Sequence, residues 1–176
     1  MNGNNGNGND VTDQPKSDLA GKTVLLVNTN SANDPLHSKK FFIKKVRNLG
    51  VKIILLGKEA ATFQPLVDFI IVADTTNYTA SLSALEAFLQ ANSDIKLDGV
   101  GTFLEDDVLL TAKIADKYRL IGPTYKVANL ARNKYSFREF CQKNNLPTIK
   151  HKELKNGRDL EEVINNFSFP LVVKPA

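Results

Sequence analysis

The chain has 176 residues, of which 42% are hydrophobic, so it can bury the core of one domain and part of a second. Its formal net charge is +4, and the basic residues are spread along the chain. A nucleic-acid-binding protein is expected to gather them on one face between aromatic side chains, so we expect no nucleic-acid partner.

The sequence lacks the features of secreted and membrane proteins. Its single cysteine, Cys141, excludes an internal disulfide and a cysteine-based zinc site, and we expect it to pack as a small apolar side chain. There is no signal-peptide pattern and no apolar run of about 18 residues. We therefore expect no membrane association and a cytoplasmic location. His37 and His151 stand alone without the spacing of a metal site, and we expect each to be a surface or loop histidine and not a ligand.

Residues 1–18 are rich in asparagine and glycine and almost free of apolar side chains. Such a segment cannot bury enough surface to offset the entropy lost on ordering, so we predict a disordered tail. The fold is therefore expected to begin near residue 20.

Strand-like and helix-like segments alternate from there to residue 122. Apolar runs predict strands at 22–28, 51–57, 67–74 and 97–103, and helical periodicity predicts helices at 37–50, 80–91 and 105–118. Alternation with short links is typical of βαβ units, right-handed crossovers and a parallel sheet. We therefore assign residues 20–122 to an α/β domain with a Rossmann-like parallel sheet.

The first predicted helix is the most basic part of the chain. Phe42, Val46 and Leu49 have the spacing of its buried face, and the lysines between Lys39 and Lys45 are expected to be solvated. We prefer this interpretation to a phosphate-binding or membrane-binding surface. Gly50 is placed as the C′ residue that ends the helix.

The pattern changes after Gly122 and Pro123, which mark a turn. Helices are predicted at 129–145 and 157–167, and strands at 148–154 and 170–174. A helix–strand–helix–strand series that follows a complete βα domain predicts the opening of a second domain over residues 124–176.

The sequence contains no classical nucleotide-binding loop. G-x-G-x-x-G and G-x-x-x-x-G-K-[ST] are both absent, and the acidic run at 105–107 is explained by the dipole of the helix it begins. Lys134 and Lys174 are the candidate binding residues. Each taken singly could be an ordinary solvated lysine. Both lie beside segments expected to pack, however, and phosphate oxygens would give both ammonium groups a partner.

Five elements in the second half of the chain follow an order found in one protein family. They are the strand end Thr102–Glu105, the turn YRLIGPT, the segment ARNK, the helix SFREFCQKNNLPT and the final segment FPLVVKP. Through these elements, residues 97–176 resemble the N-terminal portion of the ATP-grasp superfamily of ligases. Residues 20–96 agree with that family only in their βα pattern.

The resemblance implies a domain organisation and a reaction. Residues 20–122 would be the pre-ATP-grasp domain, and residues 124–176 would begin the α+β lid of the ATP-grasp domain. Lys134 and Lys174 match the two family lysines that contact ATP phosphates. The family uses ATP and Mg²⁺ to activate a carboxylate as an acyl phosphate, which an amine or similar nucleophile then attacks. The implied partners are ATP and a small carboxylate or amino-acid substrate, and a homodimer is kept as one option.

The sequence departs from the family pattern at two points. Asn133 stands where the family usually has aspartate. The chain also stops at Ala176, before the glycine-rich loop and the acidic Mg²⁺ ligands of the family. We therefore expect a fragment that contributes ATP-phosphate contacts but is incomplete for catalysis alone, with no catalytic residue or metal ligand of its own.

The branch of the family and two other interpretations remain open. The segments GKTVLLVNTN and VADTTNYTA look most like the amino-acid ligase branch, which includes carnosine synthase-like enzymes. One alternative is a non-catalytic Rossmann-like binding or interaction module derived from an ATP-grasp protein. The other is a free-standing flavodoxin-like or Rossmann-like binding protein. Arg132 is either a third phosphate contact or an ordinary arginine near a helix start.

Overall fold

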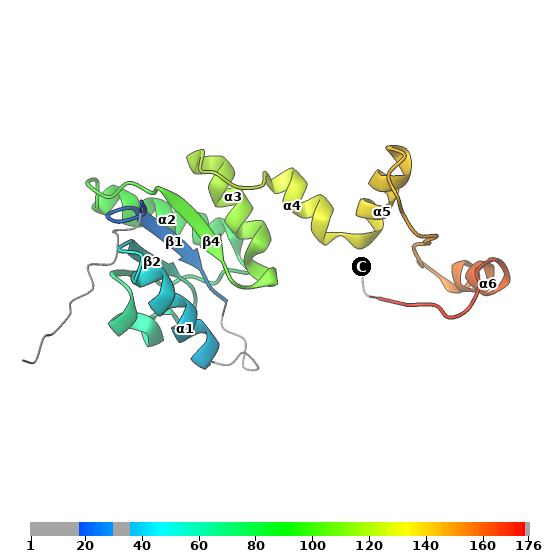
Figure 1. The fold of residues 1–176 in the computed structure, drawn as a ribbon, viewed down its shortest axis with the longest axis horizontal. Helices are drawn as coiled ribbons and strands as arrows, with labels where there is room; N and C mark the ends of the chain where they lie inside the picture. Colours follow the sequence, from blue (N-terminus) through cyan, green and yellow to red (C-terminus); the bar gives the residue numbers. More distant parts are fainter. Residues whose placement is uncertain (1–17, 30–35, 175–176) are drawn as a thin grey trace, which may run out of the picture.

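The computed structural model describes residues 18–29 and 36–174. The tail predicted over residues 1–18 lies outside this range except for Asp18, and the side chain of His37 is also outside the description. Figure 1 shows a layered α/β domain, from which a series of helices extends.

A four-stranded parallel sheet forms the centre of the α/β domain. Its strands are β1 (Thr23–Val27), β2 (Lys52–Leu56), β3 (Phe69–Ile71) and β4 (Gly99–Thr102). The spatial order is β3-β2-β1-β4, and Val24 lies opposite both Ile53 of β2 and Gly99 of β4. The predicted parallel sheet and its four strands are therefore confirmed, although each strand is shorter than predicted because the apolar runs continue into the flanking loops.

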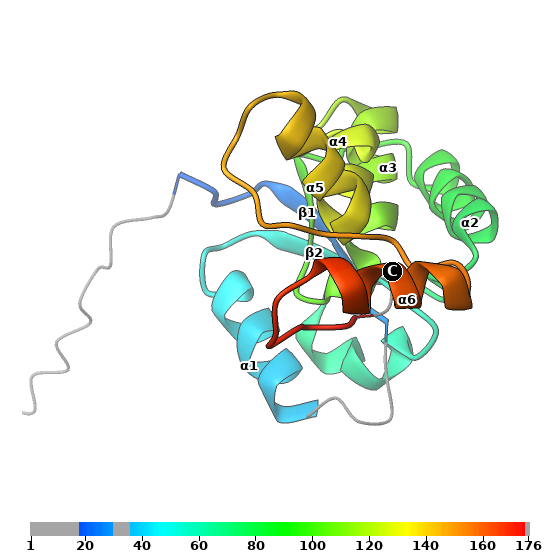
Figure 2. The ribbon, with the colours of Figure 1, turned by 90° about the vertical axis from the view of Figure 1, so that its right-hand side faces the viewer.

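Helices cover both faces of this sheet (Figures 1 and 2). They are α1 (Leu36–Arg47), α2 (Tyr78–Ala91) and α3 (Val108–Tyr118), with the short 3₁₀ helices η1 (Ala60–Leu66) and η2 (Glu105–Asp107). On one face, α1 and η1 pack through the buried Ile43 and Phe63. On the other face, α2 and α3 pack through Leu85, Leu110 and Ile114. Each face of the sheet thus has its own apolar core.

The buried face of α1 differs from the predicted one. Lys39 is only 3% exposed and Ile43 is buried, whereas Phe42 is 44% exposed. The helix is therefore rotated relative to the prediction. The ammonium group of Lys39 donates to the backbone carbonyl of Thr29 at 3.0 Å, which offsets the cost of burying the charge. Gly50 follows the helix with a φ of +77°, in agreement with its predicted place at the helix end.

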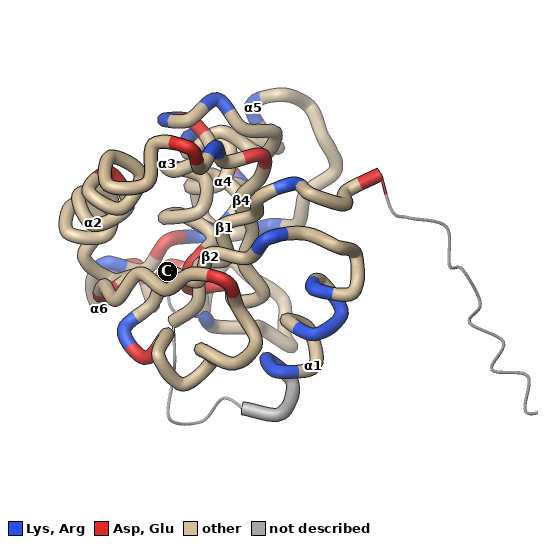
Figure 3. The backbone as a smooth tube through the Cα atoms, turned by 90° about the vertical axis from the view of Figure 1, so that its left-hand side faces the viewer, with Lys and Arg blue, Asp and Glu red and all other residues tan. Residues whose placement is uncertain are grey.

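The rotation of α1 leaves aromatic rings on the surface. Phe42 stacks on Phe103 with 4.9 Å between ring centroids, and Phe41 lies edge-on to Phe42 at 5.9 Å. Figure 3 shows Lys and Arg positions on the same helix, which carries no acidic residue. The structure does not test the expectation of no nucleic-acid partner, which stays a prediction.

Three helices form the second part of the chain: α4 (Tyr125–Arg132), α5 (Lys134–Lys143) and α6 (Gly157–Asn166). The single helix predicted at 129–145 is divided at Asn133. The side-chain oxygen of Asn133 accepts from the backbone N–H of Ser136 at 2.8 Å and so caps α5. In Figure 1, α4 continues from α3, and α6 lies farthest from the sheet.

The strands predicted at 148–154 and 170–174 are wrong. Neither segment is paired as a strand in the described part of the chain. A strand needs a neighbour that satisfies its backbone N–H and C=O groups, and the described residues provide none for these two segments. Their apolar side chains stay exposed as a result, for example Val172 at 81%.

Candidate functional site

The carboxyl ends of three strands meet in a buried polar cluster. Thr29 follows β1, Thr75 follows β3, and Asp107 lies in η2 after β4. Asp107 is 1% exposed, and its carboxylate accepts from the backbone N–H of Thr29 at 2.6 Å and from the Thr29 hydroxyl. The hydroxyls of Thr29 and Thr75 are also hydrogen-bonded to each other. We call these three residues and Lys39 the Thr29 cluster.

The Thr29 cluster lies at the switch point of the sheet, where β2 and β4 flank β1 on opposite sides. In open α/β sheets, ligands bind outside the carboxyl ends of the strands at such a point. We did not predict this cluster, because Thr29 and Asp107 are 78 positions apart in the sequence. We also assigned Lys39 to solvent and Asp107 to a helix dipole. Only the strand order brings these groups together.

Lys134 and Lys174, the predicted phosphate contacts, lie on different segments. Lys134 is the first residue of α5, and Lys174 is the last residue that the structure describes. Both side chains are exposed, and neither makes a hydrogen bond or ion pair with another described residue. Figure 1 shows the segment after α6 running back in the direction of α5. Both lysines are thus accessible to a ligand, and their binding of one triphosphate stays a prediction.

Arg132 is engaged within the protein. It is the last residue of α4 and lies two positions before the first residue of α5, so it is near a helix start as predicted. Its guanidinium group donates to the backbone carbonyl of Glu105 and lies 3.5 Å from the carboxylate of Asp106. Both partners belong to η2, so Arg132 ties the end of α4 to the carboxyl end of the sheet.

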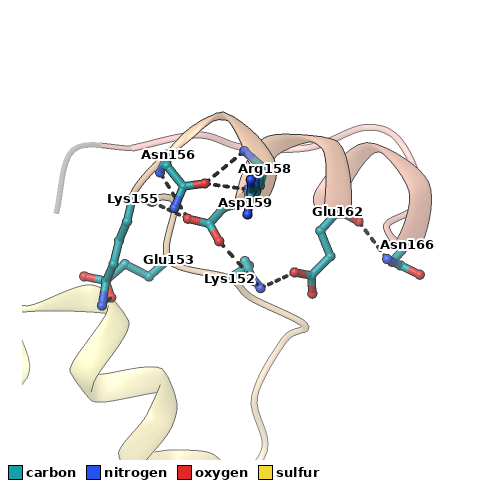
Figure 4. Close-up of polar contacts among 8 residues, drawn as sticks. All are labelled: Lys152, Glu153, Lys155, Asn156, Arg158, Asp159, Glu162 and Asn166. Carbon is teal, nitrogen blue, oxygen red and sulfur yellow. Dashed lines mark hydrogen bonds and ion pairs between the residues drawn. The ribbon is translucent and has the colours of Figure 1, made fainter.

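A second polar region lies between α5 and the start of α6. A cavity of about 350 Å³ is lined there by Tyr135, Glu139, His151, Lys152, Glu153, Lys155 and Asp159. The charged lining groups have ion-pair partners, for example Lys152 with Glu162 of α6 at 2.5 Å (Figure 4). His151 lies in the loop between α5 and α6, in agreement with the prediction of a surface or loop histidine, and is half-buried with Nε2 2.8 Å from a carboxylate oxygen of Glu139. Because these groups already have partners, the arrangement is typical of structural ion pairs.

Hydrogen bonds shift the pKa values of groups in this region. The carboxylate of Asp159 accepts from the backbone N–H of Lys155 at 2.8 Å and from that of Asn156 at 3.1 Å, which lowers the pKa of Asp159 from its ordinary value of 3.8. The hydrogen bond to Glu162 raises the pKa of Lys152. Figure 4 shows how these side chains surround the first turn of α6. Both groups therefore stay charged at neutral pH and hold this turn in place.

The described residues also bear on the expectations for the cysteine, for metal ligands and for membrane helices. Cys141 is buried on α5, as predicted for a small apolar side chain. Within residues 18–29 and 36–174, no group of three His, Cys, Asp or Glu side chains could hold a metal ion. None of the described helices is long and apolar enough to cross a membrane.

Comparison with known proteins gives matches among solved structures only, since no protein-family model and no curated protein sequence matches. An L-amino acid ligase from Bacillus licheniformis matches with a TM-score of 0.68 and 26% identity, over 89% of this chain and 37% of that one. A phosphoribosylglycinamide synthetase from Anaerococcus prevotii matches with a TM-score of 0.59 and 24% identity, over 85% of this chain and 36% of that one. An ADP complex of N5-carboxyaminoimidazole ribonucleotide synthetase matches with a TM-score of 0.60 and 18% identity, over 89% of this chain and 38% of that one.

These matches define the fold of this chain. The chain has the α/β fold of the N-terminal portion of ATP-grasp ligases, so the predicted resemblance is confirmed. Of the three matched proteins named above, only the L-amino acid ligase exceeds 25% identity, and it also has the highest TM-score. This chain spans 37% of the length of that ligase.

Proposed function

We propose that this chain is part of an ATP-dependent carboxylate–amine ligase that works through an acyl phosphate and takes an amino acid as substrate. The match of 89% of the chain to an L-amino acid ligase is the observation that carries this proposal. Residues 20–122 would be its pre-ATP-grasp domain, and residues 124–176 would begin its ATP-grasp domain. Because the chain spans 37% of the matched ligase, the remaining catalytic parts would be those that lie beyond the matched region.

Lys134 and Lys174 are the proposed ATP-phosphate contacts. Both ammonium groups are exposed and have no partner among the described residues, so they can approach phosphate oxygens without first breaking an ion pair. Mg²⁺, when bound, would neutralise part of the phosphate charge. The resemblance implies that its acidic ligands belong to parts of the ligase that this chain does not span.

The substrate would lie near the Thr29 cluster. This cluster occupies the switch point of the sheet, where ligands of open α/β folds bind. The buried carboxylate of Asp107 holds the backbone of Thr29 there, so the end of β1 is ordered before a ligand arrives. A preordered surface lowers the entropy lost on binding.

Substitution of the two lysines tests this proposal in the protein encoded by the complete gene. With ATP, Mg²⁺ and a panel of amino acids, we expect ADP formation coupled to a dipeptide or amide product. Lys134→Ala and Lys174→Ala should each raise the KM for ATP at least about ten-fold, since a charged hydrogen bond contributes roughly 1.5–3 kcal/mol. Lys143→Ala, an exposed lysine at the other end of α5, is the matched control and should leave this KM unchanged.

Two results would contradict the proposal in different ways. Unchanged KM for ATP in both lysine variants would remove the phosphate role from these residues. No ATP turnover by the unmodified protein with any amino acid would favour a non-catalytic binding or interaction module. Cell fractionation and light scattering would test the expected cytoplasmic location and whether the protein forms a homodimer.

A further inference from the structure

We propose that Arg132 is a positioning residue for ATP binding, which acts by holding the end of α4 against η2 and thereby fixing Lys134. This inference rests on the proposed function, because Arg132 acts here through the phosphate contact assigned to Lys134. Only Asn133 separates the two residues, and it both ends α4 and caps α5. Any displacement at the end of α4 is therefore passed directly to Lys134.

The start of α4 is already held on the α/β domain. The backbone N–H of Tyr125 donates to the carboxylate of Asp116, on α3, at 2.8 Å. The ammonium group of Lys113, also on α3, lies 4.1 Å from the centre of the Tyr125 ring. With its first turn fixed in this way, α4 can still pivot about that turn unless its other end is also held.

Arg132 supplies the contact at the other end. Its guanidinium group donates to the carbonyl of Glu105 and faces the carboxylate of Asp106, and its side chain is only 29% exposed. The planar fork of a guanidinium can reach two acceptors at once, which the single ammonium group of a lysine does poorly. The two ends of α4 are thus joined to different elements of the α/β domain, α3 and η2, and the pivot is blocked.

The anchor point for Arg132 is itself fixed. Asp107, the next residue of η2, is buried, and its carboxylate accepts two hydrogen bonds from Thr29 at the end of β1. Movement of η2 would break these bonds and leave a buried carboxylate without partners, which is costly. The position of Lys134 is therefore set relative to the carboxyl end of the sheet, where the substrate of the proposed ligase would lie.

A double-mutant cycle in the protein encoded by the complete gene tests this inference. Arg132→Ala should raise the KM for ATP by about ten-fold, because displacement of a binding group by about 1 Å has effects of this order or larger. In a Lys134→Ala background the same substitution should have no further effect on this KM. Arg132→Lys should restore binding only in part. Lys117→Ala is the control. It removes an exposed ion pair between Lys117 of α3 and Glu86 of α2, and it should not change the KM for ATP.

A purely structural role would give a different pattern. Arg132→Ala would then lower the melting temperature without changing the KM for ATP, or its effect on the KM would add to that of Lys134→Ala, and either result would overturn the inference. If Lys134→Ala has no effect while Arg132→Ala does, Arg132 contacts ATP directly and the inference is also wrong.

Hydrogen exchange separates this inference from the proposed function. Even in a protein without ligase activity, Arg132→Ala should speed amide exchange in α4 about five-fold or more, because the substitution removes the contact that holds the end of this helix. The exchange rates in β1 and β2 should stay unchanged. Exchange in α4 equal to that of the unmodified protein would overturn the inference whatever the enzyme does. A missing ATP reaction with faster exchange in α4 would reject the proposed function and retain the role of Arg132 as the anchor of this helix.

Discussion

Gly57 marks a place where two strands leave no room for a side chain. A Cβ atom at this position would lie 2.2 Å from the backbone carbonyl oxygen of Asn28. The backbone N–H of Asn28 donates to the carbonyl of Leu56 at 2.9 Å, and that of Gly57 donates to Ile71 at 3.0 Å. The backbone segments at the ends of β1 and β2 therefore cannot separate without loss of a hydrogen bond at the end of the sheet. Glycine is required here by close approach of the backbone.

Gly57→Ala should lower the free energy of unfolding by about 1–3 kcal/mol, because overpacking forces the backbone to shift. Gly101→Ala is the matched control: it places the same methyl group in β4, where no atom lies within 4 Å of it. We expect a change within about 0.5 kcal/mol for this control. Urea unfolding followed by circular dichroism measures both values, and equal effects of the two substitutions would show that Gly57 is not sterically required.

The start of α6 is capped by reciprocal side-chain hydrogen bonds. The side chain of Asn156 accepts from the backbone N–H of Asp159, and the side chain of Asp159 accepts from the backbone N–H of Asn156, which forms a capping box. Lys152 lies 4.0 Å from the same carboxylate. This network stabilises a helix that has few contacts with the sheet, so local interactions matter more for α6 than for α2 or α3.

Asp159→Asn should destabilise α6 at neutral pH and not at acidic pH. The pKa of Asp159 is lowered in the folded state, so its stabilising contribution is present above the ordinary pKa of 3.8 and is lost as the pH falls through the folded-state value. Thermal melts recorded by far-ultraviolet circular dichroism at a series of pH values measure the difference between this variant and the unmodified chain. Glu161→Gln, an exposed acid of the same helix, is the control. A difference that persists unchanged below pH 3.8 would argue against a role for the ionised carboxylate.

Apolar side chains are buried more completely in the α/β domain than in the second part of the molecule. The α/β domain has an apolar core on each face of its sheet, with Ile53, Ile54 and Leu56 of β2 fully buried. In the second part, Val163 is the buried residue of α6, whereas Ile164 and the apolar residues near 172 are exposed. Opening of a segment costs less free energy where fewer apolar contacts are broken. Stability is therefore expected to be concentrated in residues 22–118.

Amide hydrogen exchange should reveal this difference across the molecule. We expect the slowest exchange in β1 and β2, at a rate set by global unfolding, and the fastest helical exchange in α6, through local opening. Mass spectrometry of peptides from both parts measures these rates under identical conditions. Protection of α6 equal to that of β2 would mean that the whole chain opens as one cooperative unit.

Much of the fold could be predicted from local patterns. A strand buried on both faces leaves an uninterrupted apolar run, which is why β1 and β2 were located correctly. The capping role of Asn133 was missed because its segment has a continuous helical periodicity on both sides. The strand predicted at 170–174 was wrong because strand propensity is realised only when another strand supplies hydrogen bonds.

The sequence by itself determined the four strands of the sheet, and its motif elements indicated the resemblance to the N-terminal portion of ATP-grasp ligases, whose fold the matched structures confirm. Only the tertiary structure decided that Lys39 is buried, that Asp107 binds Thr29 across 78 positions, and that the side chain of Arg132 holds η2. The reason is physical. Apolar periodicity depends on neighbours along the chain, whereas the partner of a polar side chain depends on the order in which the strands assemble.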